Sequence, residues 1–375
     1  MSGSGEARPA APEFGQGKPC PYNSRVGISG GLTAENFFCK FGFAMKTLIT
    51  GASGLGGGNL ARHLWSRNER DLRVLLRKTS KTLALQDLQV EIAYGDIQDA
   101  ASLVPAMNGV ERVYHCAAST SQWPPAYDAS YRVNVLGTVN VLEAALKAKV
   151  TRVVYVSTVD TLGFSSLKHP ADENWPEHDS MAKYGNPYFD TKYAAEQKAK
   201  DFLKRGLDLV IVKPTTMFGE WDLKPSSGQF IVQVAKGRAP GYPGGGSNFV
   251  DVLDVAEGMR LAMDKGKTGE SYILGNEQGN MTYKDFFTLI AKIAGKKPPS
   301  FRIPYPVAVL GGYLFDLAGR IFRFEPDVNS VTAKIGYAPH YFTARKAIRE
   351  LGLPQSKIED AVARAIAWFT KYGYL

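Results

Sequence analysis

From Lys46 onward, short apolar runs of the β type alternate with longer helical stretches. The candidate strands are residues 46–50, 72–76, 90–93, 112–116, 152–156 and 207–212. The longest candidate helices between them cover about 55–67, 129–148 and 187–205. Strands separated by helices of this length form βαβ units, in which the strands are parallel. The alternation therefore predicts an α/β fold with a doubly wound parallel sheet and helices on both faces.

The alternation loosens after Pro214. Proline and glycine cluster in residues 225–228 and 239–246, and helical patterns then dominate at 252–263, 283–294 and 358–369. We expect residues 45–214 to form the main domain. Residues 215–375 should form a smaller, mostly helical, discontinuous lobe that binds substrate, with a partial return to the main sheet near Phe249 and Tyr272.

The first 44 residues differ from the rest in composition. Residues 1–15 are rich in Gly, Ser, Ala and Pro, and they lack the apolar segment of a signal peptide. Met45 stands directly before the first strand. We expect residues 1–44 to be a disordered extension, either an added leader or the product of an upstream start. An organelle transit segment is the alternative, which the acidic residues disfavour.

Charge and cysteine content narrow the class of partner. The net charge is +9, but Lys and Arg are scattered, without a basic helix or an aromatic-rich ribbon. This favours an anionic cofactor over nucleic acid. Cys20, Cys39 and Cys116 form no CxxC pair, which argues against a disulfide framework and a zinc site. We therefore expect no metal and a reducing, cytoplasmic location.

The most apolar segment covers residues 307–322, and Asp316 and Arg320 interrupt it. It is too short and too polar for a membrane span. We expect a buried or amphipathic helix and no stable membrane insertion. A pocket wall and contact with a membrane are the alternatives.

A glycine-rich turn connects the first strand to the first helix in residues 50–58, TGASGLGGG. Glycine lets the backbone approach a pyrophosphate closely, and the amides at a helix N-terminus attract the anion. The strand before the turn and the helix after it make the signal specific. Residues 45–214 are therefore predicted to be an NAD(P)-binding Rossmann domain. The predicted contacts in this turn are Gly51, Ser53, Gly54, Leu55, Gly56 and Gly57.

Arg77 stands twenty residues after Gly57, at the end of the second strand. A carboxylate at this position would accept the ribose hydroxyls of NAD, whereas a guanidinium would pair with the 2′-phosphate of NADP. Arg77 therefore favours NADP(H) over NAD(H), and Lys81 is a candidate second cation.

Tyr188 and Lys192 lie four residues apart in a predicted helix, so that both side chains lie on one face. A free phenol has a pKa near 10, and a nearby ammonium would lower it. Among the 18 tyrosines, Tyr188 alone has this partner. The pair predicts a general acid, Tyr188, with Lys192 beside it and on the ribose of the cofactor. An ordinary pair on a helix surface is the alternative.

The glycine spacing of 51, 54 and 57 resembles the TGxxGxxG turn of the short-chain dehydrogenases/reductases, in their extended, or atypical, branch. The resemblance runs from about Met45 to the C-terminus. It includes residues 115–118 (HCAA), 213–219 (KPTTMFG), 248–258 (NFVDVLDVAEG) and 346–352 (KAIRELG). The motifs resemble most the dihydroflavonol-reductase and 3β-hydroxysteroid-dehydrogenase group.

The resemblance implies further roles. Thr158, five residues before Gly163, is expected to hold the substrate oxygen near Tyr188, and Ser157 is expected near the nicotinamide. Asp96 would receive the adenine amino group, and Asn134 would support the site from behind. Further cofactor contacts are expected at Ile97, Ala117, Ala118 and Pro214.

Two kinds of chemistry are compatible with this superfamily. One is the reduction of a ketone or aldehyde, or oxidation of the alcohol. The other is the epimerisation or dehydration of a nucleotide sugar with tightly bound NAD(P). Sugar-nucleotide enzymes usually carry an Arg-Asp pair where Ser247-Asn248 stands, and dehydratases an Asp-Glu pair where Val159-Asp160 stands. Both departures favour the reductase. A non-catalytic NADP sensor is a third possibility, which Tyr188 and Lys192 disfavour.

Five apolar residues are candidates for an apolar, aromatic or alicyclic substrate, although core packing explains them equally well. The five candidate substrate residues are Trp123, Phe164, Met217, Phe218 and Phe230.

The predicted helices 129–148 and 187–205 offer a homodimer face by analogy with the superfamily.

Overall fold

The computed structural model describes residues 45–176, 184–225 and 227–375, and the predicted extension 1–44 lies outside them. The described residues form a seven-stranded sheet with the order β3-β2-β1-β4-β5-β6-β9, in which every neighbouring pair is parallel. The predicted doubly wound α/β fold is confirmed. The strands are β1 (Thr47–Thr50), β2 (Leu72–Leu76), β3 (Glu91–Tyr94), β4 (Arg112–His115), β5 (Arg152–Val156), β6 (Leu209–Pro214) and β9 (Ser271–Leu274).

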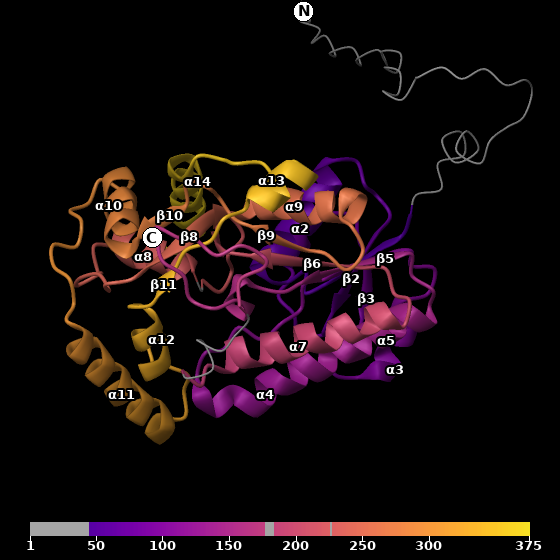
Figure 1. Cartoon of the computed structure of the whole chain (residues 1–375), viewed down its shortest axis with the longest axis horizontal. Helices are drawn as coiled ribbons and strands as arrows, with labels where there is room; N and C mark the ends of the chain where they lie inside the picture. Colours follow the sequence, from indigo (N-terminus) through magenta and orange to yellow (C-terminus); the bar gives the residue numbers. More distant parts are fainter. Residues whose placement is uncertain (1–44, 177–183, 226) are drawn as a thin grey trace, which may run out of the picture. The chain divides into compact units, whose positions relative to one another are not determined.

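Helices cover both faces of this sheet, so the central strands β1, β4, β5 and β6 are almost entirely buried and rich in apolar residues. One face carries α3 (Ala100–Ala106), α5 (Gly137–Lys147) and α7 (Pro187–Lys204), and the opposite face carries α2 (Leu55–Ser66), α9 (Val252–Lys265) and α13 (Arg345–Leu351) (Figure 1). Strand order reverses between β1 and β4, so the predicted ligand cleft lies beyond their carboxyl ends.

The helix predicted over 129–148 is divided into three segments. They are α4 (Tyr127–Tyr131), a π-helical turn (Arg132–Leu136) and α5. Such turns are frequent at functional sites, and this one carries Asn134. Short 3₁₀ turns occupy Leu83–Leu85, Pro124–Ala126 and Val159–Thr161.

A second, four-stranded sheet belongs to the C-terminal half. It contains β7 (Thr216–Phe218), β8 (Gly246–Asp251), β10 (Asn280–Thr282) and β11 (Pro339–His340). Tyr272 lies in β9 and joins the main sheet as predicted, but the predicted return near Phe249 is wrong. Phe249 lies in β8, where its ring stacks on Phe286 with 3.7 Å between centroids, so aromatic packing fixes this strand in the second sheet.

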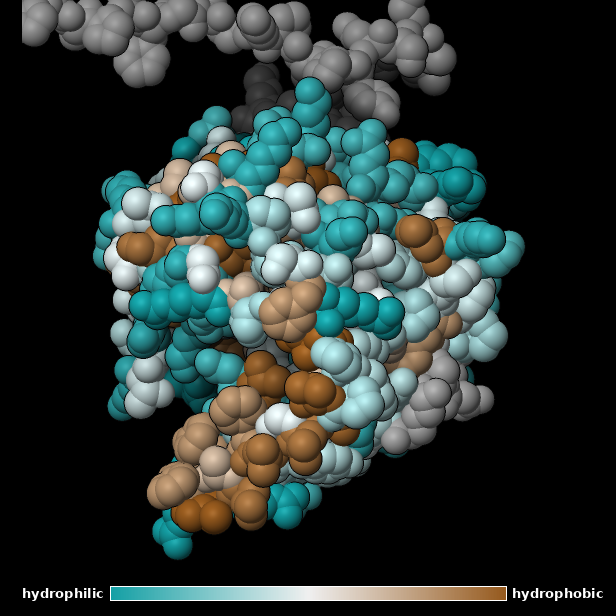
Figure 2. Space-filling view, turned by 90° about the vertical axis from the view of Figure 1, so that its left-hand side faces the viewer, coloured by the Kyte–Doolittle hydropathy of each residue, from teal (hydrophilic) through white to brown (hydrophobic). Residues whose placement is uncertain are grey.

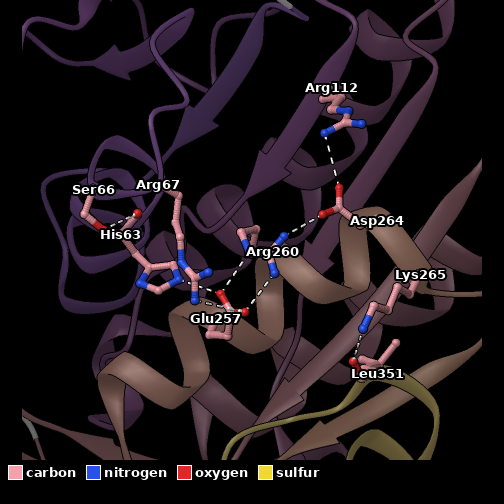
Figure 3. A network of polar contacts seen from close by, with 9 residues as sticks. All are labelled: His63, Ser66, Arg67, Arg112, Glu257, Arg260, Asp264, Lys265 and Leu351. Carbon is pink, nitrogen blue, oxygen red and sulfur yellow. Dashed lines mark hydrogen bonds and ion pairs between the residues drawn. The ribbon is translucent and has the colours of Figure 1, made fainter. Parts of the chain in front are cut away.

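Helix α9 ties residues beyond 214 to the main domain (Figure 3). Its Glu257 contacts His63 of α2 at 2.6 Å and Arg260 at 2.8 Å. Asp264, at the end of α9, contacts Arg112 of β4 at 3.3 Å. These contacts and the apolar packing of α9 on α2 join α9 to the main domain.

The remaining helices pack on the second sheet or beside it. Helices α8 (Gly228–Ala235), α10 (Tyr283–Ile293) and α14 (Ile358–Lys371) share one aromatic core with β7 and β8. Helices α11 (Tyr305–Phe322) and α12 (Ser330–Ile335) lie together at one end (Figure 1).

Helix α11 fits one of its two predicted environments. It forms over the expected residues, but it is not a buried helix, because within it only Gly312 and Gly319 are buried. Of the two predicted environments, the amphipathic one applies, with the apolar side exposed. Leu314 and Ile321 are about 60% and 63% exposed. None of the helices in the described chain is long and apolar enough to span a membrane.

Candidate active site

The glycine turn is packed too closely for side chains. Gly51 has φ +74°, and a Cβ at this position would lie 2.6 Å from the Ala117 nitrogen. A Cβ on Gly57 would lie 2.4 Å from the Gly51 carbonyl oxygen. Gly54 precedes α2 without a side-chain cap, which leaves the amides of the first turn available to an anion. The turn therefore fits the pyrophosphate of a dinucleotide.

The other predicted cofactor residues lie along the same edge of the sheet, because each follows a parallel strand. Arg77 follows β2 and is exposed. Asp96 follows β3, where its carboxylate accepts the Gln98 amide at 2.9 Å. The Ala117 amide donates to Thr50 Oγ1 at 3.2 Å, which holds the loop after β4 against the glycine turn. Ser53, Leu55 and Gly56 belong to the glycine turn and the start of α2, Ile97 follows Asp96, Ala118 and Ser157 follow β4 and β5, and Pro214 ends β6.

Tyr188 and Thr158 bring their hydroxyl groups together at this edge. Tyr188 lies in the first turn of α7, where Asn186 caps the helix by accepting the Tyr188 amide at 2.9 Å. Burial raises the pKa of Tyr188 above its ordinary value, and the Asp160 carboxylate raises it further, while a hydrogen bond with Thr158 opposes the rise. The phenol is therefore protonated at neutral pH and can act as a proton donor.

Lys192 lies one turn further along α7 and is buried. Its Nζ donates to the Val156 carbonyl at 2.7 Å and to the Tyr155 hydroxyl at 3.1 Å. Burial lowers the pKa of Lys192 to about 8, and Glu196 opposes this. We expected the ammonium to lower the pKa of Tyr188. In the structure the ammonium is bound at the end of β5 instead, and burial dominates the pKa of the phenol.

A buried ion pair below α7 was not predicted from the sequence. Lys213 Nζ donates to both oxygens of Glu196, at 2.7 and 2.9 Å, and both side chains are almost fully buried. Ser157 Oγ also donates to Glu196, at 2.6 Å. The Ser157 hydroxyl therefore points to this pair, below the cofactor edge. A lysine within the apolar run of β6 was the available signal, because a buried lysine needs a partner.

Asn134 connects the loop after β4 with helix α7. Its side-chain oxygen accepts the Ser119 amide at 2.7 Å, and its nitrogen donates to the Thr191 hydroxyl at 2.8 Å. The Thr191 hydroxyl donates in turn to the Pro187 carbonyl at 2.6 Å. The geometry fits the expected supporting role, in which Asn134 fixes the first turn of α7.

The candidate substrate residues divide into two groups. Phe164 packs near Tyr188 in an apolar cluster with Tyr184, Phe189 and α12. Trp123 lies in the loop that leads to α4, and Met217 approaches Gly56, where a Cβ would lie 3.3 Å from the methionine methyl group. Phe218 and Phe230 pack in the aromatic core of the second sheet, against Phe286 and against Tyr283 and Phe287.

Asp160, which sequence analysis noted only as a departure from the dehydratase pattern, lies beside the hydroxyl pair. Its carboxylate accepts the Thr158 hydroxyl at 2.8 Å. Burial raises the pKa of Asp160 to about 6. The nearest cation would be His340, whose Nε2 lies 3.9 Å away, but burial lowers the pKa of His340 to about 3. The histidine is neutral at pH 7, so the ionised carboxylate has no ionic compensation from it.

Asp160→Asn should stabilise the protein at neutral pH. The unfolded carboxyl ionises near its ordinary pKa of 3.8 and the folded one near 6, so the folded state binds the proton more tightly and the parent loses stability across this window. The difference in unfolding free energy between the variant and the parent should therefore grow from pH 4 to pH 6 and then level off. Thermal unfolding at pH 4, 5, 6 and 7 measures it. Asp201→Asn, which removes an exposed carboxylate of α7, is the control, and an advantage independent of pH would contradict this assignment.

The sequence profile of the NAD dependent epimerase/dehydratase family matches residues 47–275. The chain belongs to this family. Two relatives are similar to this chain over most of its length. One is a Synechocystis sp. protein whose name refers to dihydroflavonol 4-reductase. The other is the sterol demethylase protein B of Methylococcus capsulatus. The first is 36% identical over 87% of this chain and 95% of the relative. The second is 35% identical over 88% of this chain and 100% of the relative.

A solved structure is also similar to this chain. The crystal structure of gox2253 is 38% identical and covers 88% of this chain and 99% of its own, with a TM-score of 0.76. The predicted resemblance to the extended short-chain dehydrogenases/reductases is therefore confirmed. This epimerase/dehydratase family member is an NAD(P)-dependent oxidoreductase, since several of its relatives are named as reductases or dehydrogenases.

Proposed function

We propose that this enzyme uses NADP(H) to reduce a ketone or aldehyde group on a bulky apolar molecule, or to oxidise the corresponding alcohol. The observation that carries the proposal is the position of the Tyr188 phenol beside the Thr158 hydroxyl, at the edge of the sheet that also carries the glycine turn. A bound nicotinamide supplies or accepts the hydride. The chain has to position the carbonyl and exchange one proton with its oxygen.

Each side chain has a defined part in this scheme. Tyr188 donates a hydrogen bond to the carbonyl oxygen, which orients the carbon and stabilises the charge that develops on oxygen. Thr158 would add a second hydrogen bond once its hydroxyl turns to the substrate from the Asp160 carboxylate, to which it donates in the structure. Tyr188 donates its proton to this oxygen, because an alkoxide is a stronger base than a phenolate. Lys192, whose Nζ donates to the Val156 carbonyl, would supply a positive charge near the site and would bind the ribose hydroxyls of the cofactor.

The surroundings of Tyr188 support an apolar substrate. Phe164, Phe189 and two residues of α12, Val331 and Ile335, form an apolar cluster with the Tyr188 ring. Such a wall favours a molecule without charged groups next to its carbonyl. The names of two relatives refer to a dihydroflavonol and to a sterol, which agrees with a bulky, largely apolar substrate.

The segment that departs from the sugar-nucleotide pattern also supports a reductase. Asn248 is buried, and its side chain donates to the Asn276 carbonyl at 2.7 Å and accepts the Thr215 hydroxyl at 2.9 Å. Ser247 shares a hydrogen bond of 2.6 Å with Thr216. Both side chains hold the second sheet together and offer no cation to a diphosphate. A nucleotide-sugar epimerase or dehydratase is therefore the less favoured alternative, and an NADP sensor without activity the least favoured.

Arg77→Asp should shift cofactor preference from NADP(H) toward NAD(H). A hydrogen bond to a charged group contributes about 1.5–3 kcal/mol, so the ratio of kcat/KM for the two cofactors should change by about 10- to 100-fold. Steady-state rates with NADPH and NADH measure the ratio. Lys297→Asp, an equal charge change on an exposed loop residue, is the control. A ratio that stays the same in Arg77→Asp would remove Arg77 from the cofactor site.

The proposed reaction is tested by a paired screen. NADPH oxidation is followed with a panel of apolar ketones and aldehydes, and nucleotide-sugar turnover is followed without added cofactor. Oxidation of NADPH by members of the first panel alone supports the reductase. Turnover in the second assay alone would overturn it in favour of the epimerase, and NADPH binding without either turnover would favour the sensor.

A further inference from the structure

Helix α11 presents a continuous apolar surface to solvent. Among the described residues, nine of its large apolar side chains are about half exposed or more, from 48% for Tyr305 to 74% for Phe322. Figure 2 shows apolar residues gathered on one projecting part of the surface. A soluble domain rarely exposes so many neighbouring apolar groups without a partner. The exposed residues of this α11 surface are Tyr305, Val307, Leu310, Tyr313, Leu314, Phe315, Leu317, Ile321 and Phe322.

The opposite side of α11 is small and polar, and it is packed against the protein. A Cβ on Gly312 would lie 2.7 Å from the Ser330 Cα, and a Cβ on Gly319 would lie 2.7 Å from the Phe324 carbonyl oxygen. Asp316, between the two glycines, faces the Ser330 amide at 3.4 Å. The helix cannot turn its apolar side inward, because only glycine allows this approach. Helix α11 therefore packs its small and polar side against the protein and exposes its apolar side, which is the reverse of an ordinary surface helix.

The charges at the ends of α11 favour an anionic partner over a second copy of the chain. Arg320 and Arg323 are exposed at its C-terminal end, where the exposed Glu325 and Asp327 follow them, and Arg302 is exposed just before its N-terminal end. Two parallel copies of α11 would bring the C-terminal arginines together. Two antiparallel copies would bring them to Arg302 and to the positive N-terminal end of the other helix. Phosphate groups, in contrast, complement all three cations.

The dimensions and residue types agree with a lipid surface. An 18-residue helix is about 27 Å long, and lying flat it would place its whole apolar side at the boundary of headgroups and acyl chains. Tyrosines are favoured at this boundary, as Tyr305 and Tyr313 would be, and arginines can extend their charged groups to the headgroups. The chain as a whole carries a net charge of +9, which attracts it to an anionic surface.

We infer that the α11 surface docks this enzyme on a phospholipid bilayer that contains anionic lipid, with the helix lying in the plane of the interface. This inference is independent of the proposed reaction. Its consequence for the candidate active site, in contrast, rests on the proposed function. Helix α12 packs on α11 and carries Val331 and Ile335 of the apolar cluster beside Tyr188, so docking would place that cluster one helix away from the lipid.

The test uses the full chain and sedimentation with large unilamellar vesicles. One set contains phosphatidylcholine with phosphatidylglycerol, and the other contains phosphatidylcholine alone. The variant Leu310→Ser/Leu314→Ser/Ile321→Ser removes three exposed apolar groups whose loss should leave the fold intact. The control Ile92→Ser/Val104→Ser/Leu167→Ser removes three exposed apolar groups elsewhere. Circular dichroism checks that both remain folded, and NADPH binding checks the main domain.

The parent and the control should bind the anionic vesicles, and the α11 variant should bind them at least about a hundredfold more weakly. Arg320→Gln/Arg323→Gln should weaken binding to the anionic vesicles by about fivefold per arginine, with little effect on phosphatidylcholine alone. Equal binding by parent and α11 variant would overturn the inference.

A protein partner for α11 would give a different pattern. Sedimentation velocity without lipid compares the parent with the α11 variant. A parent dimer that the variant dissociates, without vesicle binding by either, would assign the surface to a second copy. To test cover by the chain's own residues 1–44, Leu314→Cys is labelled with an environment-sensitive fluorophore and compared with identically treated parent. Emission that is already blue-shifted in a monomer and unchanged by vesicles would overturn the inference in favour of those residues.

Discussion

Replacement of Tyr188 by Phe should lower kcat for carbonyl reduction by about 10²–10⁴-fold, the usual contribution of a positioned general acid. The substitution removes one hydroxyl group and keeps the ring in its apolar cluster with Phe164 and Phe189. The Asn186 cap of α7 binds backbone amides and is unaffected. NADPH affinity should therefore change little. Stopped-flow single turnover gives the rate of the chemical step, and NADPH fluorescence gives the affinity.

Tyr131→Phe removes the hydroxyl of an exposed tyrosine and serves as the matched control, with kcat expected to equal that of the parent. A Tyr188→Phe variant that keeps most of the parent rate would exclude Tyr188 as the proton donor. A variant that loses NADPH binding to the same extent as kcat would instead assign Tyr188 a role in holding the cofactor.

Lys213→Met should destabilise the protein by about 3–5 kcal/mol, because it leaves a buried carboxylate without its closest cation. Glu196 is fully buried, and its remaining partners would be the Ser157 and Thr161 hydroxyls and Lys200, which lies 3.3 Å away and is partly exposed. Methionine replaces the lysine stem within β6 at nearly equal volume. Equilibrium unfolding in urea at pH 7 measures the loss through the shift of the midpoint.

The double variant Lys213→Met/Glu196→Gln separates charge from packing. A neutral amide can still accept the hydroxyl hydrogen bonds, so the double variant should recover most of the stability lost by the single one. Lys200→Met removes the more exposed partner of Glu196 and should cost less than about 1 kcal/mol. A double variant as unstable as Lys213→Met would show that the lysine acts through packing in β6 rather than through its charge.

The elements that could be predicted from the sequence are those whose determinants are local. The strands β1 to β6 and the turn at Gly51 follow from apolar runs and glycines within a few residues of one another. The spacing of Tyr188 and Lys192 fixes their placement on one helix in the same way. Their electrostatics could not be predicted, because the carbonyl of Val156 and the burial of the phenol depend on how α7 packs on β5.

Features that depend on distant residues were missed for the same reason. Glu196 and Lys213 meet only because α7 lies over β6. The lysine in the apolar run of β6 indicates that it has a partner, but not which residue the partner is. Phe249 was placed in the wrong sheet, since an apolar run does not specify which strands it pairs with. The environment of α11 was left open between two alternatives because apolar density alone does not distinguish a buried helix from one whose small residues face the protein.

The central claim is that this member of the epimerase/dehydratase family consumes NADPH to reduce a carbonyl group. The most direct measurement uses NADPH in which both hydrogens at C4 of the nicotinamide are deuterium, the full chain and an apolar ketone that is active in the screen, with mass spectrometry of the product. The account predicts an alcohol that carries the deuterium and an equal amount of NADP⁺. An alcohol without deuterium, or a nucleotide sugar that is converted while NADPH is not consumed, would contradict it.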